Sequence, residues 1–223
     1  MKRTIKSYVL RAGRISNRQQ FALDNLLAHY EVPFTGTFWN WSELFKRDAQ
    51  TVVEIGFGMG ASLLAMAEAH PEQNFLGIEV HRAGVGSLIA DLHEKNIENV
   101  RIVVHDAVEI FTKQIPPESL AGVQIFFPDP WPKKRHHKRR LIQPELIKTL
   151  AAAIKQGGFI HCATDWEEYA EQMLEVLSNE NALINKMSDG GYSPRPETRP
   201  VTKFEKRGQG LGHGVWDLIF IKK

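Results

Sequence analysis

The sequence predicts an α/β protein with a mainly parallel, seven-stranded sheet, helices on both faces and an antiparallel C-terminal strand. Three observations lead to this fold class. Short apolar runs alternate with segments of helical periodicity. The connections between them are short, which favours right-handed crossovers and parallel strands. A last apolar run, residues 216–221, follows a long glycine-rich loop and is expected to add antiparallel to the sheet.

Five apolar runs are the expected parallel strands, and each is followed by a helical segment. Runs of this kind are typical of strands buried on both faces of a parallel sheet. The expected strands are residues 51–56, 74–80, 100–106, 122–127 and 158–163. The expected helices are residues 61–70, 82–96, a turn or two after 106, 143–157 and 166–177.

The charge distribution divides the chain into a basic arm and one domain. Residues 1–20 contain six Lys or Arg residues, no acidic residue and no clear periodicity, so we expect a mobile arm before a single domain over residues 21–223. Residues 133–140 contain six more basic residues. Removing these twelve from the 28 basic residues leaves 16 against 26 acidic ones, a balance of about −10. Two cationic tracts on an acidic protein favour a polyanionic partner.

The composition excludes several classes of protein. A hydrophobic content of 43% is too high for a mainly disordered chain. No apolar run approaches the length of a membrane span, and the basic N-terminus lacks the apolar core of a signal peptide. The single cysteine, Cys162, lies in an apolar run and leaves no disulfide framework. We therefore expect a cytoplasmic protein; monomer and homodimer remain open.

A glycine-rich segment follows the first expected strand. Gly56, Gly58 and Gly60 let the backbone turn tightly and approach a ligand at the N-terminus of the next helix. Glu79 comes 21 residues after Gly58, at the end of the second strand, where a carboxylate can accept hydrogen bonds from two ribose hydroxyls. This combination predicts a nucleotide-containing cofactor, and by itself it also fits a nicotinamide dinucleotide.

Two further acidic residues favour S-adenosylmethionine. Glu54 stands two residues before the first glycine, where its carboxylate would repel a pyrophosphate but attract an ammonium or a sulfonium. Asp106 ends the third strand, where it can accept a hydrogen bond from an adenine amino group. The carboxyl ends of parallel strands meet at one edge of a sheet, so we expect one cofactor site there. The structural alternative is an ordinary turn with acids that cap helices.

Pro128-Asp-Pro-Trp131 follows the fourth expected strand and leads directly into the basic tract of residues 133–140. Asp129 can hold the N–H edge of a base, and Trp131 can stack on that base. The adjoining cations predict a nucleic-acid substrate. The adjacent His136 and His137 lack a partnering Cys or acid in the sequence, so we expect them to face phosphate, and we predict no metal.

These motifs resemble those of the bacterial tRNA (guanine-N7)-methyltransferases, which have a Rossmann-like class I methyltransferase fold. The resemblance spans roughly residues 50–222. The Pro-Asp-Pro-Trp element with its basic continuation is highly specific, whereas the glycine motif alone is weak. The matching motifs are Glu54-Ile-Gly-Phe-Gly-Met-Gly60, Gly77-Ile-Glu79, Pro128-Asp-Pro-Trp131, Ala163-Thr-Asp165 and Thr202-Lys-Phe-Glu205.

The resemblance implies methyl transfer from S-adenosylmethionine to N7 of a guanosine in the variable loop of tRNA. It implies cofactor contacts at Glu54, Glu79, Asp106 and Asp129, with Asp129 as the catalytic residue. Because guanine N7 has a free lone pair and no proton, we expect Asp129 to orient the base and stabilise developing charge. The implied tRNA contacts are Lys133, Arg135, Lys138, Arg139, Arg140, Asp165, Thr202, Lys203, Phe204 and Glu205.

Several alternatives remain open at this stage. The residues alone also fit a methyltransferase acting on an exocyclic amine of adenine, an RNA-binding protein without turnover, or a nicotinamide-dependent dehydrogenase. The dehydrogenase is disfavoured by Glu54 and by the lack of an obvious His or Tyr constellation for hydride transfer. Asp165 also has two readings, because the residue before residues 166–177 can cap that helix or contact the substrate.

Overall fold

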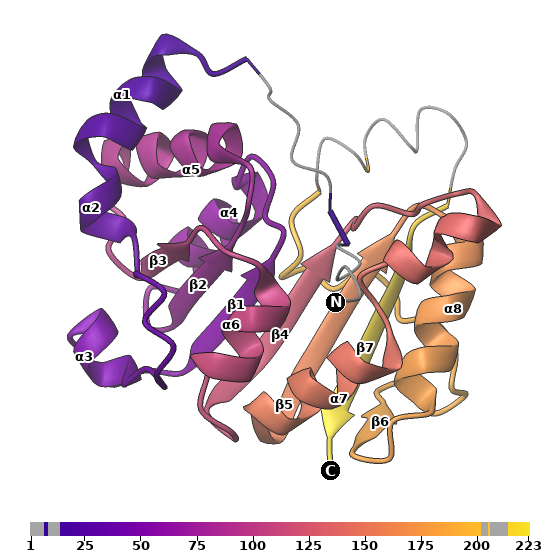
Figure 1. The fold of residues 1–223 in the computed structure, drawn as a ribbon. Coiled ribbons are helices and arrows are strands. Elements are labelled where there is room, and N and C mark those ends of the chain that lie inside the picture. Colours follow the sequence, from indigo (N-terminus) through magenta and orange to yellow (C-terminus); the bar gives the residue numbers. More distant parts are fainter. Residues whose placement is uncertain (1–6, 9–13, 202–204, 206–213) are drawn as a thin grey trace, which may run out of the picture.

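The computed structural model describes residues 7–8, 14–201, 205 and 214–223, and within them seven strands form one sheet of order β3-β2-β1-β4-β5-β7-β6 (Figure 1). β1 to β5 are parallel to one another, and β7 is antiparallel to β5 and to β6. This confirms the predicted fold class. The strands are β1 (Thr51–Ile55), β2 (Asn74–Ile78), β3 (Val100–Val103), β4 (Leu120–Phe126), β5 (Ile154–Thr164), β6 (Leu183–Asn185) and β7 (Trp216–Lys222).

Helices cover both faces of the sheet. α4 and α5 pack on one face of β1 to β3, and α1 lies against α5. α6, α7 and α8 pack on the other face. The helices are α1 (Asn17–Asn25), α2 (Leu27–Tyr30), α3 (Trp41–Phe45), α4 (Ala61–Ala69), α5 (Arg82–Glu94), α6 (Ala107–Lys113), α7 (Pro144–Ala153) and α8 (Glu167–Ser178), with a 3₁₀ helix η1 (Lys134–Arg139).

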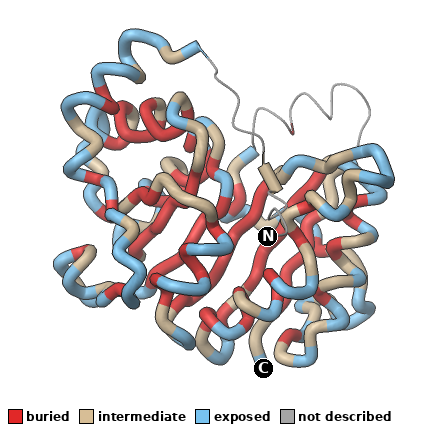
Figure 2. The backbone as a smooth tube through the Cα atoms, viewed as in Figure 1, coloured by how far each residue is buried: buried red, intermediate tan, exposed pale blue. Residues whose placement is uncertain are grey.

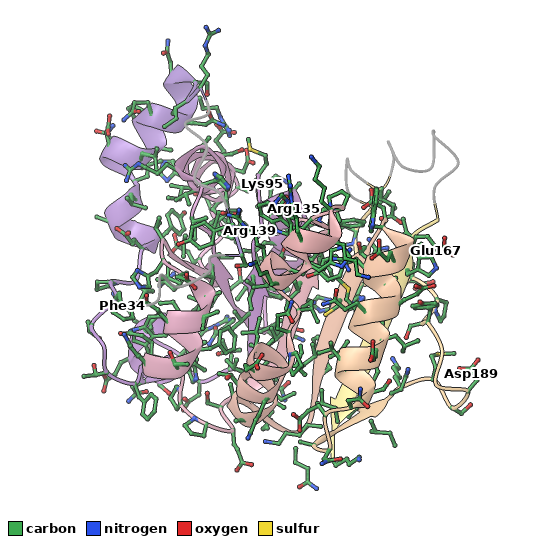
Figure 3. All side chains as sticks on the ribbon, turned by 45° about the vertical axis from the view of Figure 1, so that its right-hand side comes forward. Phe34, Lys95, Arg135, Arg139, Glu167 and Asp189 are labelled. Atoms are coloured by element: carbon green, nitrogen blue, oxygen red, sulfur yellow. The ribbon has the colours of Figure 1, made fainter. Side chains whose placement is uncertain are left out.

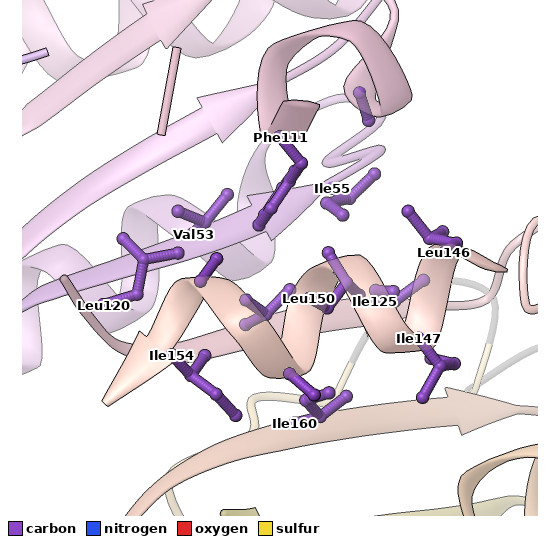
Figure 4. Close-up of a cluster of buried hydrophobic side chains, with 14 of the residues drawn as sticks. Val53, Ile55, Phe111, Leu120, Ile125, Leu146, Ile147, Leu150, Ile154 and Ile160 are labelled. Atoms are coloured by element: carbon purple, nitrogen blue, oxygen red, sulfur yellow. The ribbon is translucent and has the colours of Figure 1, made fainter. Parts of the chain in front are cut away.

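The sheet is buried on both faces, which explains why its strands are continuous apolar runs. Every residue of β1, β2 and β4 is buried, and Figure 2 shows the buried strands between helices with exposed outer faces. In Figure 4, Leu146 and Leu150 of α7 pack over Ile125 of β4, with Val53 of β1 alongside. This core holds the strand ends in register, and those ends carry the polar residues of interest.

The first helix begins at Asn17, inside the segment predicted to be a basic arm, residues 1–20. Ser16 and Gln19 form a capping box: the Ser16 hydroxyl accepts from the Gln19 N–H and the Gln19 side chain accepts from the Ser16 N–H. Arg18 pairs with Asp91 and Glu94 of α5 at 2.7 and 2.9 Å. Residues 17–20 therefore belong to the folded domain rather than to the basic arm.

The seventh helix ends at Ala153, before the expected stop at Gly157. β5 begins at Ile154 and its pairing with β4 shifts register between Leu120 and Gly122. Gly157 has φ = 74° within this irregularity. Gly157 therefore belongs to a bulge at the start of β5 and does not end α7.

Candidate active site

A pocket of about 190 Å³ lies where the carboxyl ends of β1 to β4 meet. The structure brings Gly56, Glu79, Asp106 and Asp129 to its wall, as the strand order requires. Its remaining lining residues come from the same strand ends, from Leu141 and from the N-terminal segment. They are Ser7, Tyr8, Ile55, Ile78, Val80, His81, His105, Ala107, Phe126, Phe127, Pro128 and Leu141.

Glu79 is held in one orientation by the backbone. Its Oε2 atom accepts from the Gly58 N–H at 2.9 Å, and its Oε1 atom accepts from the N–H groups of Val80 and His81 at 2.6 and 3.0 Å. A carboxylate has about four acceptor positions, two on each oxygen, so these three bonds leave one position, on Oε2, for a ribose hydroxyl. Glu79 is 6% exposed, and its carboxylate is fixed before any ligand arrives.

Glu54 lies behind the pocket wall and does not line it. It is 2% exposed, and its Oε2 atom has no hydrogen-bond partner in the described part of the chain. Burial, with a smaller contribution from the charge of Glu79, raises the pKa of Glu54 to about 8. A buried carboxylate without a cationic partner is costly, so this position favours binding of a positive group nearby.

Gly56, Gly58 and Gly60 differ in what they do. All three have positive φ, at 73°, 58° and 84°, which glycine adopts without strain. A Cβ on Gly56 would meet nothing within 4 Å, and Gly56 lines the pocket. A Cβ on Gly60 would lie 2.6 Å from Cβ of Leu88, so Gly60 lets α4 pack on α5. Gly58 and Gly60 shape the loop from outside the pocket wall.

Asp106 both caps a helix and faces the pocket. Its Oδ1 atom accepts from the Val108 N–H at 3.0 Å at the start of α6. The neighbouring His105 also lines the pocket, and its ring stacks on Phe34 with centroids 4.2 Å apart. Phe34 lies against α6, where Lys113 stands over its ring, and from there it fixes the position of His105 (Figure 3).

The turn after β4 has an unusual backbone. Phe127 and Trp131 have φ of 51° and 45°, a region that residues other than glycine rarely adopt. Asp129 lies between them, exposed at the pocket rim. Backbone strain of this kind persists at sites where function requires it. The turn therefore presents Asp129 to the pocket at a cost in local stability.

Trp131 is already engaged on one ring face. The Arg139 guanidinium lies 4.2 Å from its ring centroid, and its Nε1 donates to the Ser7 carbonyl at 3.2 Å. The sequence offered no indication of the contact with Ser7. Stacking of a base on Trp131 stays a prediction, and the ring face opposite Arg139 is the one to which it applies.

The basic tract forms η1 directly after this turn, and most of its cations reach solvent. Lys133, Lys134, Arg135 and Lys138 are exposed and Arg139 is half-buried. Figure 3 shows Arg135 and Arg139 beside the carboxyl ends of the strands. Exposed cations at this position are suited to phosphate groups, which is what the sequence predicts for Lys133, Arg135, Lys138 and Arg139.

Arg140 does not belong to this exposed set. It is 2% exposed; its Nε donates to the Pro130 carbonyl at 2.8 Å and its Nη1 to Gln172 Oε1 at 2.6 Å. Its guanidinium also lies 4.8 Å from the Tyr169 ring centroid. The prediction that Arg140 contacts RNA is corrected: it ties the turn after β4 to α8.

Glu205 is likewise corrected. It is 2% exposed and pairs with the Arg199 guanidinium at 2.7 Å, so its carboxylate is buried in an ion pair and does not lie on the surface. Its predicted neighbours Thr202, Lys203 and Phe204 lie outside the described residues. The sequence could not distinguish an exposed glutamate from a buried one in this loop.

Asp165 is half-buried at the end of β5 and does not cap α8. The N-cap residue of α8 is Trp166, which makes no side-chain capping bond, and the Thr164 hydroxyl accepts from the Trp166 N–H at 3.2 Å. The capping interpretation of Asp165 is therefore wrong, and its contact with tRNA stays a prediction.

Among residues 7–8, 14–201, 205 and 214–223, no three His, Cys, Asp or Glu side chains are grouped as metal ligands would be. Across the same residues, no helix is long and apolar enough to cross a membrane.

The two histidines of the basic tract have different surroundings. The Nε2 atom of His137 lies 3.4 Å from a Glu168 carboxylate oxygen. Burial, together with the neighbouring cations, lowers the pKa of His136.

Solved structures share the fold. An antibiotic-related methyltransferase aligns with a TM-score of 0.56 at 14% identity, covering 89% of this chain and 98% of that one. The antibiotic-resistance methyltransferase Kmr aligns with a TM-score of 0.56 at 12% identity, covering 86% and 94%. The sheet order, the antiparallel β7 and these neighbours define a Rossmann-like class I methyltransferase fold.

Sequence comparisons give the family. A family model described as "Putative methyltransferase" matches residues 48–218. The tRNA (guanine-N(7)-)-methyltransferase of Legionella pneumophila strain Philadelphia 1 is 68% identical over the whole of both chains. That of Paraburkholderia xenovorans is 54% identical over all of this chain and 85% of its own. The chain belongs to the tRNA (guanine-N7)-methyltransferase family.

Proposed function

We propose that this protein transfers a methyl group from S-adenosylmethionine to N7 of a guanosine in the variable loop of tRNA. The observation that carries the proposal is the continuity of the site: a pocket walled by Glu79, Asp106 and Asp129 passes directly into the exposed cations of η1. Acids for a cationic cofactor and cations for a polyanionic substrate meet at one turn. On this proposal the protein acts on tRNA in the cytoplasm.

The residues present fit S-adenosylmethionine. Glu54, buried and with an unpartnered Oε2 atom, would ionise when a cationic cofactor binds and then balance the charge of its ammonium or sulfonium. Glu79 is held to accept from a ribose hydroxyl, and Asp106 keeps its Oδ2 atom for the adenine amino group. When bound, the cofactor supplies an electrophilic methyl carbon on sulfur.

Asp129 and the backbone around it act on the guanine. N7 attacks with its own lone pair, so no residue has to remove a proton before the displacement, and positive charge develops on the purine. A carboxylate at the rim orients the base and stabilises that charge, and the strained turn fixes its position.

The experiment is product mapping. The purified protein is incubated with methyl-labelled S-adenosylmethionine and bulk tRNA, and the nucleosides are separated. The proposal predicts label in 7-methylguanosine, at a position that borohydride and aniline cleave within the variable loop. Label in a methyladenosine would support the adenine amino-methyltransferase instead, and tRNA binding without label would support a non-catalytic RNA-binding protein.

A further inference from the structure

A cluster of buried charged residues lies beside the RNA side of the site. Arg199, Glu205, Asp217 and His161 are 1, 2, 2 and 4% exposed. They come from three separate segments: the loop after β6, the start of β7 and the middle of β5. Burying charge is costly unless the groups are paired, so the arrangement of the partners is informative.

Arg199 is saturated by two carboxylates. Its Nε and Nη2 atoms donate to Oδ1 and Oδ2 of Asp217 at 2.7 and 2.9 Å. Its Nη1 and Nη2 atoms donate to Oε2 and Oε1 of Glu205 at 2.7 and 3.2 Å. Both pairs are bidentate, which fixes the relative orientation of the two carboxylates as well as their distance.

The cluster is anchored to the sheet on the far side of Arg199. His161 Nε2 lies 2.7 Å from Asp217 Oδ1, and Asp217 pairs in register with Ala163 near the carboxyl end of β5. Although burial acts in the opposite direction, the bonds from His161 and Arg199 hold the pKa of Asp217 below its ordinary value. The carboxylate therefore stays charged and keeps Arg199 in place.

Arg199 also touches the turn that carries Asp129. Its guanidinium carbon lies 5.6 Å from the Phe127 ring centroid and 6.0 Å from that of Phe126. Phe127 has positive φ and stands two residues before Asp129. A single side chain therefore joins the start of β7, Glu205 and the strained end of β4.

The cluster is not needed to pair the strands. Asp217 is already held by the β5–β7 ladder and by the Ser193 N–H, which donates to the Asp217 carbonyl at 2.8 Å. Replacing a buried ion pair by apolar residues is often neutral for stability, so stability does not explain why charge is retained here. A requirement for fixed geometry at the reaction site would explain it.

We propose that Arg199 is a positioning residue for methyl transfer: it holds Glu205 and the Phe127–Asp129 turn in a fixed relation, and thereby aligns the RNA side of the site with the transferring methyl group. This rests on the proposed function. Arg199 contacts neither pocket nor solvent, so it acts through Glu205 and Phe127. Lysine cannot replace it, because one ammonium cannot form two bidentate pairs.

The test uses the full-length variants Arg199→Lys and Glu205→Gln, alone and together, assayed for methylation of tRNA at a temperature where each is folded by circular dichroism. A misalignment of the reacting groups predicts a kcat that is about 10- to 100-fold lower in each single variant, with the Kd for S-adenosylmethionine unchanged. Because the two residues act as one unit, the double variant is expected to be no slower than the slower single variant.

Arg47→Lys is the matched control. Arg47 Nε donates to Asn74 Oδ1 and its Nη1 to the Pro71 carbonyl, both at 2.7 Å, at the amino end of β2 and away from the pocket. It should lose thermal stability and keep its kcat. Wild-type kcat in folded Arg199→Lys, losses that multiply in the double variant, or an equal loss in Arg47→Lys would each overturn the positioning role. A wild-type protein that leaves tRNA unmethylated would overturn the proposed function itself, and this inference with it.

Discussion

The two halves of the active site are built in different ways. On the cofactor side, Glu79 is held by three backbone N–H groups, one of which belongs to the glycine-rich turn. On the RNA side, orientation depends on side-chain pairs between distant segments, such as Arg199 with Asp217 and Arg140 with Gln172. The cofactor half is thus formed by local backbone geometry, and the RNA half by packing of the complete domain.

The comparison suggests how the halves respond to change. Backbone donors cannot be removed by substituting one side chain, so the cofactor half should tolerate mutation of its surroundings. The RNA half has buried arginines that connect its segments and exposed cations that we propose bind tRNA. Substitutions in these two groups should therefore have different effects. Asp129 lies where the two halves meet, so its substitution should lower the rate of methyl transfer more than the affinity for either ligand.

The largest expected effect is at that junction. Asp129→Asn should lower single-turnover methylation about 100-fold, because a neutral amide cannot stabilise the charge that develops on the purine. The Kd values for S-adenosylmethionine and for tRNA should stay within about threefold of wild type. Asp189→Asn is the control, because Asp189 lies in an exposed turn where its carboxylate accepts from the Gly191 N–H. Near-wild-type turnover of Asp129→Asn would remove Asp129 from the chemistry.

The next effect concerns Glu54 and pH. Its pKa is about 8 in the folded protein against about 4.5 when unfolded, so the folded protein retains a proton that the unfolded chain has lost. Without cofactor, this group therefore makes stability fall as pH rises from about 4.5 to about 8. A cationic cofactor favours the ionised carboxylate, so binding below pH 8 should release the proton of Glu54. The affinity for the cofactor should therefore rise with pH, by up to about tenfold per pH unit, until about pH 8 is reached.

Isothermal titration calorimetry at pH 6 and 7, in two buffers of different ionisation enthalpy, measures this proton release directly. Glu54→Gln cannot ionise and should lose that part of the pH dependence. The amino group of the cofactor also titrates, and its contribution remains in the variant. An identical proton release in wild type and Glu54→Gln would show that Glu54 is not coupled to the cofactor.

The smallest effect distinguishes the two kinds of arginine. Arg135→Gln removes an exposed cation and should reduce the slope of log K for tRNA against log salt by about one unit if Arg135 contacts one phosphate. Arg140→Gln leaves Pro130 without its buried donor and should lower Tm while the salt slope stays at the wild-type value. The slope is measured by filter binding between roughly 50 and 200 mM salt. The reverse pattern would contradict the assignment of the two side chains.

The difference between the halves also explains what could be predicted from the sequence. The strand order brings Glu79, Asp106 and Asp129 together because each follows a strand, and strand ends are visible as a change from apolar to polar residues. Burial of Arg140 and Glu205 could not be predicted in this way. In the sequence they continue a basic run and a polar loop, and their partners lie 32 and 6 residues away in packing that only the folded domain creates.

The N-terminal contacts had no sequence pattern at all. Ser7 and Tyr8 line the pocket, and the Ser7 carbonyl accepts from Trp131, 124 residues further along the chain. A serine and a tyrosine in a basic segment carry no periodicity that would place them against a strand end. Such contacts follow from the shape of the pocket rather than from local propensity.

The separation of the two halves is tested most directly by measuring both dissociation constants on one matched pair of variants. Glu79→Gln should weaken S-adenosylmethionine by about tenfold or more, through the loss of charge-assisted bonds to the ribose, and leave the Kd for tRNA at its wild-type value. The double variant Arg135→Gln/Lys138→Gln should weaken tRNA severalfold and leave the Kd for S-adenosylmethionine unchanged. If either change weakened both ligands to the same extent, the site would not be divided into a cofactor half and an RNA half that meet at Asp129.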